Sequence, residues 1–224
     1  MRQKAESSPQ LKEWLDRLAP VVQSARAQLA TVKPGKIALR SGCELDSDGS
    51  YRLSFFWKDY IVSADDFCVR AAADGKEPSS FTQSLILTYM ATADGTTPSS
   101  HWVGFRELPD GLFYVQAFQG YTGTRFVDSI EQGSAGGDPL KALDIFRRAA
   151  KRLGCVPYEI GDAGFLFDVL PRVQLAVVYW AGDDELPSQA RVLFEDTAAH
   201  YLPTDGLAIL GSQLIGRLLK AAAQ

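Results

Sequence analysis

The fold class follows chiefly from residues 165–180, FLFDVLPRVQLAVVYW. This segment holds two apolar runs, residues 165–169 and 175–180, which are joined through Pro171-Arg172. Short apolar runs bounded by turn residues are typical of buried β-strands. A third such run, residues 192–194, follows an acidic turn and predicts a further strand in the same block.

Helices are predicted on both sides of this block of strands. Asp138-Pro139 marks the start of one, because aspartate caps a helix and proline fits its first turn. A last helix is expected to start near Thr204 and to carry Gly211 on its apolar face. Glycine costs about 1 kcal/mol relative to alanine inside a helix. Its presence at Gly211 therefore predicts a close backbone contact.

The middle of the chain also contains helical patterns. Residues 81–93 follow two serines that can cap a helix and carry apolar residues at helical spacing. Residues 113–132 are expected to contain another helix, interrupted near Gly120 and Gly123 because glycine disfavours a helix interior.

The N-terminal third predicts one long helix followed by a meander of strands. Apolar residues recur at helical spacing over residues 11–29, and the helix is expected to break or kink at Pro20. Residues 37–39 and 51–57 alternate apolar and polar side chains, as half-buried strands do. The antiparallel meander is expected to continue through residues 60–69.

The strands therefore fall in two blocks separated by helices. This order favours an α+β fold, in which antiparallel sheet regions pack with amphipathic helices, over alternating βαβ units. With 224 residues, the chain suits one large domain. We expect residues 1–33 to form an N-terminal amphipathic helix that packs on a single compact domain, residues 34–224.

Composition excludes several classes of protein. Apolar residues make up 46% of the chain and charged residues 22%, which are ordinary values for a globular protein. A net charge of −4 argues against a nucleic-acid partner. No apolar run approaches the roughly 20 residues of a membrane span, and residues 1–8 lack the apolar core of a signal peptide. A cytoplasmic protein with reduced thiols and no membrane partner is expected.

Metal chemistry has few donors to draw on. Three cysteines and two histidines are too few for an all-cysteine zinc site or a self-contained iron–sulfur cluster. Asp183, Asp184 and Glu185 follow a predicted strand and can bind a hard cation if a pocket gathers them. The alternative is a solvated turn. Asp196 and His200, one helical turn apart, can share a metal. The alternative is that Asp196 caps a short helix, residues 197–201, and His200 is a polar surface residue.

Two further features allow binding of a large flat ligand. Aromatic residues make up 11% of the chain, and their clusters suit either the walls of a pocket or an ordinary core. His101 lies at a predicted junction between loop and strand, where it is either an axial ligand to the metal of a cofactor or a loop residue.

Two motifs carry a resemblance to a known family. The first is WVGFRELPDG, residues 102–111, followed by Tyr114 and Phe118. The second runs from LPRV (170–173) through YWAGDDELP (179–187) and VLFED (192–196) to YLPTD (201–205) and Leu210-Gly211. Together they resemble a prokaryotic family known only as domain of unknown function 3786. The resemblance extends from about residue 30 to the C-terminus. It departs from the family pattern at Leu186, where an aromatic residue is usual, and at Glu195.

The resemblance implies a metabolic context but no reaction. Some relatives are fused to a small cysteine-rich iron–sulfur domain, and members are common in anaerobes with corrinoid and one-carbon metabolism. It therefore implies a binding or accessory protein for a tetrapyrrole, a corrinoid being one case, or for a partner that is an iron–sulfur or corrinoid protein. The candidate cofactor-binding residues are His101, Trp102, Arg106, Glu107, Arg172 and Trp180.

Two alternatives remain open from the sequence. One is an enzyme that uses Asp183, Asp184 and Glu185 as a carboxylate or metal site. The other is a protein-interaction module, which predicts an exposed apolar patch and no enclosed pocket. The sequence leaves the oligomeric state open.

Overall fold

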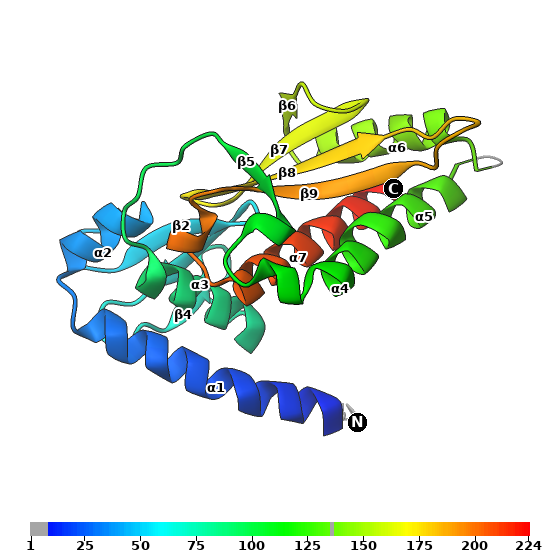
Figure 1. Cartoon of the computed structure of the whole chain (residues 1–224). Coiled ribbons are helices and arrows are strands. Elements are labelled where there is room, and N and C mark those ends of the chain that lie inside the picture. The colour runs from blue at the N-terminus through cyan, green and yellow to red at the C-terminus, as the bar shows by residue number, and fades with distance from the viewer. Residues whose placement is uncertain (1–8, 135–136) are drawn as a thin grey trace. The chain divides into compact units, whose positions relative to one another are not determined.

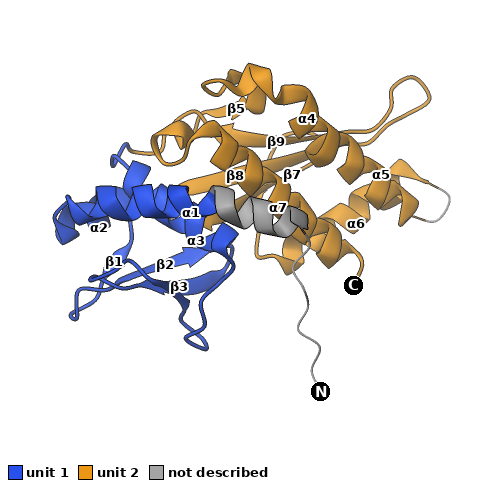
Figure 2. Ribbon diagram, turned by 90° about the horizontal axis from the view of Figure 1, so that it is seen from below, with its two compact units in different colours: residues 1–96 blue, residues 97–224 orange. Residues whose placement is uncertain are grey.

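The chain divides into two compact units, residues 1–96 and residues 97–224 (Figure 2). The computed structural model describes residues 9–134 and 137–224, so the predicted absence of a signal peptide at residues 1–8 lies outside the described residues. Each unit has its own antiparallel sheet and its own helices, which confirms the α+β prediction. The predicted division into residues 1–33 and a single domain of 34–224 stays a prediction.

The helices of the first unit are α1 (Pro9–Ala30), α2 (Pro34–Ser41) and α3 (Ser80–Thr92). Helix α1 continues through Pro20, so the predicted break does not occur. Although proline removes one hydrogen bond from the helix, α1 packs against α3 through its C-terminal half, where Ala25 and Leu29 are buried. This packing explains how the helix tolerates the proline.

The predicted strand at residues 37–39 is wrong, because these residues belong to α2. Pro34 occupies the first turn of α2, and Gly42 ends the helix with a φ of 69° while its N–H bonds to the carbonyl of Ala38. Proline at the start and glycine just past the end are the usual helix boundaries. Ile37 and Ser41, one helical turn apart, form the buried side of α2.

The sheet of the first unit is the predicted antiparallel meander. Its strands follow the order β1-β2-β3-β4 and are β1 (Glu44–Leu45), β2 (Tyr51–Phe55), β3 (Lys58–Val62) and β4 (Val69–Ala71). Phe56 and Trp57 form the two-residue turn between β2 and β3, with φ values of 47° and 62°. Two positive φ angles are typical of the turn that matches strand twist in a tight hairpin. Trp57 therefore lies in a turn and not in the predicted strand.

The second unit contains a five-stranded antiparallel sheet in the order β5-β9-β8-β7-β6 (Figure 1). Its strands are β5 (Trp102–Gly104), β6 (Val156–Tyr158), β7 (Ala163–Leu170), β8 (Val173–Trp180) and β9 (Gln189–Glu195). The β7–β8 hairpin, which turns at Pro171-Arg172, is the one predicted from residues 165–180. Strand β9 is longer than predicted, and the short edge strand β6 was not predicted at all.

Helices cover one face of this sheet (Figures 1 and 2). They are α4 (Val115–Gln119), a π-helical segment (Gly120–Thr124), α5 (Arg125–Gln132), α6 (Pro139–Arg152) and α7 (Thr204–Ala222). The interruption predicted near Gly120 and Gly123 is thus a π-helical turn that keeps α4 and α5 continuous. Asp138 caps α6 as predicted, by accepting hydrogen bonds from the N–H groups of Leu140 and Lys141.

Three short 3₁₀ turns complete the unit. They are η1 (Phe105–Glu107), η2 (Gly111–Phe113) and η4 (Ala198–His200). Among residues 9–134 and 137–224, no helix combines the length and the apolar character needed to cross a lipid bilayer.

The aromatic residues of the second unit mostly form its core. Phe105 stacks on Phe118 with ring centroids 4.2 Å apart, and both rings lie within about 6 Å of Phe194. Phe146 contacts Phe165 and Tyr179 from the helical layer. The sequence allowed these aromatic clusters to be either the walls of a pocket or an ordinary core, and the rings named here form core.

Gly211 makes the close contact that the sequence predicted. A Cβ atom at this position would lie 2.8 Å from Cζ and 2.9 Å from Cε2 of Phe118, in the middle of the aromatic core. Gly216 lies in the same helix and has no atom within 4 Å of its would-be Cβ. The two glycines therefore separate the effect of packing from the effect of helix propensity.

We predict that Gly211→Ala lowers the free energy of unfolding by about 1–3 kcal/mol, the usual cost of overpacking a core. Gly216→Ala is the matched control and should raise it by about 0.5–1 kcal/mol, because alanine favours a helix. Urea denaturation followed by circular dichroism measures both. Equal effects of the two substitutions would contradict the assigned contact with Phe118.

Candidate functional site

Three polar side chains, those of Ser99, His101 and Asp196, form a hydrogen-bonded chain at the β5 edge of the second unit's sheet. The Ser99 hydroxyl donates to Oδ1 of Asp196 at 2.5 Å, and Nδ1 of His101 lies 3.2 Å from Oδ2 of the same carboxylate. Ser99 Oγ also accepts the backbone N–H of His101 at 3.0 Å. We call this arrangement the Ser99–Asp196–His101 relay.

The pairing of two strands far apart in the sequence builds the relay. Strands β5 and β9 pair with Trp102 opposite Glu195, so the residues just outside this pair, His101 and Asp196, also face each other. The N–H of Asp196 donates to the carbonyl of His101 at 3.0 Å and extends the ladder by one bond. Residues 95 positions apart are thereby held side by side.

The backbone between Ser99 and His101 is strained. Ser100 has a φ of 62°, a left-handed conformation that is uncommon for a residue with a side chain. Its N–H donates to Oε1 of Glu195 at 3.1 Å, and the Thr197 hydroxyl lies 3.5 Å from Oε2. Glu195 is only 5% exposed. The buried side chain of Glu195 therefore stabilises this turn through the hydrogen bond from Ser100. Backbone strain of this kind is often found at functional sites.

The two neighbouring carboxyl groups have opposite electrostatic environments. Burial raises the pKa of Glu195, and the negative charge of Asp196 adds to that effect. The hydrogen bond from Ser99 lowers the pKa of Asp196, so this group is ionised at neutral pH. An ionised Asp196 favours a proton on Nδ1 of His101 and leaves the lone pair on Nε2.

Nε2 of His101 is open to solvent. The side chain of His101 is 72% exposed, and in the described part of the chain no group hydrogen-bonds to Nε2. Chemically, this nitrogen can ligate a metal or accept a proton.

The other predicted cofactor-binding residues are only partly gathered around His101. Trp102 follows it directly, and Arg172 lies at the same end of the sheet because β8 begins opposite the residue that follows β9. Trp180, in β8, pairs with Gln189 at the far end of β9, seven residue steps from the Asp196 that faces His101, or about 24 Å at 3.4 Å per residue. There its ring packs under the guanidinium of Arg191, 5.8 Å from the ring centroid.

Arg106 and Glu107 lie just beyond β5, in η1. Oε2 of Glu107 accepts the N–H of Gly104 at 2.8 Å, so Glu107 caps the turn that ends the strand. Arg106 is exposed.

Trp102 projects to the sheet face opposite the helices, where its ring lies 5.6 Å from that of Tyr158 on the opposite edge strand. The sheet must therefore curl strongly to bring its two edges together.

The acidic residues 183–185 form a turn. Oδ1 of Asp183 accepts the N–H groups of Glu185 and Leu186, at 2.9 and 2.8 Å, and these bonds lower the pKa of Asp183. Asp184 and Glu185 are exposed. Nowhere in residues 9–134 and 137–224 do three His, Cys, Asp or Glu side chains gather as a metal site. A metal site at Asp183, Asp184 and Glu185 stays a prediction that no such cluster supports.

Sequence reasoning missed Ser99 and assigned Asp196 to a different neighbour. It considered Asp196 together with His200, four residues away, whereas the carboxylate contacts His101 and Ser99. A local spacing rule cannot find a partner 95 positions away. A Ser-x-His sequence directly before a strand was the only available signal.

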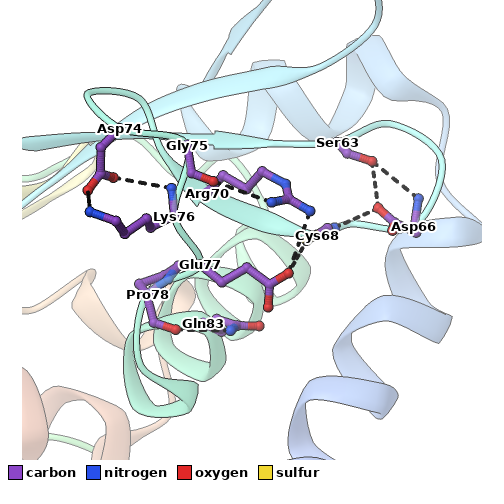
Figure 3. A network of polar contacts seen from close by, with 10 residues as sticks. All are labelled: Ser63, Asp66, Cys68, Arg70, Asp74, Gly75, Lys76, Glu77, Pro78 and Gln83. Atoms are coloured by element: carbon purple, nitrogen blue, oxygen red, sulfur yellow. Dashed lines mark hydrogen bonds and ion pairs between the residues drawn. The ribbon is translucent and has the colours of Figure 1, made fainter. Parts of the chain in front are cut away.

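A second polar network lies in the first unit, in the loops on either side of β4 (Figure 3). Asp66 accepts the hydroxyl of Ser63 at 2.6 Å and the N–H of Cys68 at 2.9 Å. Glu77 lies 3.5 Å from the guanidinium of Arg70 and 3.6 Å from Sγ of Cys68. Burial and the charge of Glu77 raise the pKa of Cys68, whereas Arg70 lowers it. The network stabilises turns and suppresses the thiolate that a nucleophile needs.

The buried carboxyl group of Glu195 predicts a pH dependence of stability. Because its pKa is raised in the folded state, its contribution to stability is complete below the unfolded-state pKa and is lost as pH rises through the folded-state pKa. Glu195→Gln cannot ionise and still accepts the Ser100 N–H. We expect its melting temperature to exceed that of the wild type at pH 7–8, with the difference shrinking toward pH 4–5.

Thermal unfolding followed by circular dichroism between pH 4 and 8 measures this difference. Glu185→Gln, at an exposed position, controls for the loss of one negative charge. Melting curves for Glu195→Gln and the wild type that stay parallel over the whole pH range would refute the assignment.

The network around Cys68 predicts opposite effects of its two charged neighbours. Glu77→Gln should speed alkylation of Cys68 by iodoacetamide at pH 8, because removing the carboxylate lowers the pKa of the thiol. Arg70→Gln should slow it. Both rates are measured by mass spectrometry in a Cys155→Ala background, in which Cys43, a buried thiol with a pKa raised to about 11, does not compete. Rate changes of the same sign would be inconsistent with the network.

Comparison with known proteins places the chain in a family. A family model described as a domain of unknown function (DUF3786) matches residues 33–217. No curated protein and no solved structure matches the chain. The match spans most of the chain, including both motifs that carried the resemblance. The protein therefore belongs to the DUF3786 family.

Proposed function

We propose that the protein is a binding or accessory protein whose His101 supplies one ligand, through Nε2, to the metal of a tetrapyrrole, a corrinoid being one case. The observation that carries the proposal is the Ser99–Asp196–His101 relay. A tetrapyrrole brings four nitrogen ligands for its metal, so the protein needs to add only one or two. Two histidines in the whole chain are enough for that task.

The relay supports the proposal through the chemistry of histidine as a ligand. A histidine that binds a metal usually donates its other ring N–H to a carboxylate, which fixes the tautomer and the orientation of the ring. Asp196 is placed to accept that proton, and Ser99 holds the carboxylate by its second oxygen. The strained backbone at Ser100 keeps Ser99 and His101 on the same carboxylate.

Access to His101 supports a metal centre that approaches from outside. The side chain is largely exposed, so the metal of a free tetrapyrrole, or of one carried by a partner protein, can reach Nε2. Trp102 and Arg172, at the same end of the sheet, are proposed to contact the ring and its polar substituents. The proposed site does not include three of the residues expected from the sequence, Arg106, Glu107 and Trp180.

The thiols support a cytoplasmic location, and the net charge bears on nucleic acid as a partner. Cys43, Cys68 and Cys155 are all free, as expected in a reducing cytoplasm. The net charge of −4 does not favour nucleic acid. A corrinoid or iron–sulfur protein is the proposed partner, and this part of the proposal rests on the resemblance to the family.

Titration with hydroxocobalamin and with haemin, followed by absorbance, tests the proposal. Wild-type protein should shift the spectrum of at least one of them and co-migrate with it on gel filtration. His101→Ala should abolish the shift, and Asp196→Asn should weaken binding about 10–100-fold, as loss of such a supporting carboxylate does.

His200→Ala is the matched control, because His200 is the chain's other histidine and also exposed. It should bind like the wild type. The proposal fails if neither compound changes its spectrum with wild-type protein, or if His101→Ala binds as well as the wild type.

A further inference from the structure

A long hollow follows the edge of the second unit's sheet, away from the relay. One part, of about 470 Å³, lies between η1, the edge of β9 and the start of the π-helical segment. A second part, of about 480 Å³, lies beside η2 and α4. Arg106 and Gln119 line both parts, so we treat them as one groove and call it the β9 groove. Figure 2 shows β5, β9 and α4 close together in this region.

The floor of the groove includes an unpaired piece of sheet edge. Strand β5 pairs only with residues 193–195 of β9, because it ends at Gly104. Asp196 donates to His101 on the β5 side, so by the alternation of an antiparallel ladder Phe194, Val192 and Ala190 also direct their N–H and C=O groups to that side. Of these three residues, Phe194 pairs with Val103, and the carbonyl of Ala190 is covered by Gly123, whose would-be Cβ lies 2.9 Å from it.

Val192 is thus the residue whose backbone groups face the groove. No hydrogen bond from another element reaches them among residues 9–134 and 137–224. Val192 is 3% exposed as a whole residue, backbone included, so an incoming chain reaches its N–H and C=O only when the neighbouring side chains on the groove wall, those of Gln119 and Thr122, move aside. A buried backbone N–H and C=O without partners cost stability, and an added extended chain can satisfy both.

The charge on the walls of the groove is unbalanced. Arg106 and Arg191 both line it, both are exposed, and neither forms an ion pair with a carboxylate in the part of the chain that the structure describes. The nearest acid on the wall, Glu107, accepts the Gly104 N–H to cap η1. Arg191 lies over the Trp180 ring, but neither guanidinium has a carboxylate partner among the described residues, so the two favour a ligand that carries a carboxylate.

The far end of the groove is apolar and exposed. Leu112, Phe113 and Tyr114 are 59%, 81% and 60% exposed, and Leu112 and Phe113 line the hollow beside α4. Three consecutive large apolar residues in solvent are unusual for a surface, and such clusters mark interaction sites. They provide a contact for an apolar side chain.

From these features we infer that the β9 groove binds an extended acidic segment of a partner protein. The backbone of the segment pairs with Val192, where β5 would continue if it did not turn at Phe105. A carboxylate of the segment lies between Arg106 and Arg191, and an apolar side chain rests on Leu112 and Phe113. This site does not depend on His101, so it stands or falls separately from the proposed function.

Selection from a phage library of random linear ten-residue peptides against the full-length protein tests the inference. The expected outcome is enrichment of sequences that combine Asp or Glu with a large apolar residue. A synthetic peptide from that pool should shift the backbone amide of Val192 in a ¹⁵N NMR spectrum. The double variant Arg106→Gln, Arg191→Gln should bind it at least tenfold more weakly.

Two controls separate the groove from general charge and from folding. Arg148→Gln removes an exposed arginine from α6, outside the groove, and should bind the peptide like the wild type. Methylation of the peptide nitrogen that pairs with Val192 should abolish binding by an intact protein. Failure to enrich such peptides, or binding that Arg106→Gln and Arg191→Gln leave unchanged, would overturn the inference. Self-association through the groove, lost in the arginine variant, would assign it to a second copy of this chain and overturn it as well.

Discussion

The pairing of β5 with the C-terminal end of β9 is the contact on which both proposed sites depend. It is only three residue pairs long, yet it joins segments more than 85 positions apart. At one end of this ladder Ser99 and His101 meet Asp196. At the other end β5 stops short and leaves the backbone of Val192 facing a groove. One short ladder therefore determines both where the exposed imidazole lies and where the sheet edge is unpaired. Closing so long a loop costs conformational entropy, which the packing of the aromatic core offsets.

The second unit has unfavourable features at the relay and in the β9 groove. A buried carboxyl group and a serine in a left-handed conformation lie at the relay, and an exposed apolar cluster at residues 112–114 lies in the groove. All of them cost stability, and a sequence selected only for folding would avoid them. The rest of the unit conforms closely to the expected rules. The β7–β8 hairpin is buried almost throughout, α6 is capped by Asp138, and Gly211 makes room for Phe118. This contrast is the general physical reason for looking for function at the β5 edge.

Local patterns predicted much of the fold, and they failed where distant contacts decide the outcome. The strands within residues 165–180 and the helix after Asp138 depend on neighbouring residues, so their sequences predict them. Residues 37–39 alternate like a strand, but the boundaries at Pro34 and Gly42 make them helical. For the candidate site, the sequence pointed to His101 through its position before a strand. It could not identify Asp196 as the partner of His101, because only the β5–β9 pairing brings them together.

The position of β5 in the chain also has a consequence for biosynthesis. Proteins emerge from the ribosome N-terminus first, and His101 is made about 95 residues before the Asp196 that orients it. Until β9 has emerged, β5 has no strand to pair with. Asp196 is then not in place to favour the proton on Nδ1 of His101 over Nε2. A nascent or truncated chain that ends before residue 196 therefore displays a histidine with no fixed orientation. The arrangement of β5 and β9 restricts an oriented imidazole to chains in which residue 196 has been made.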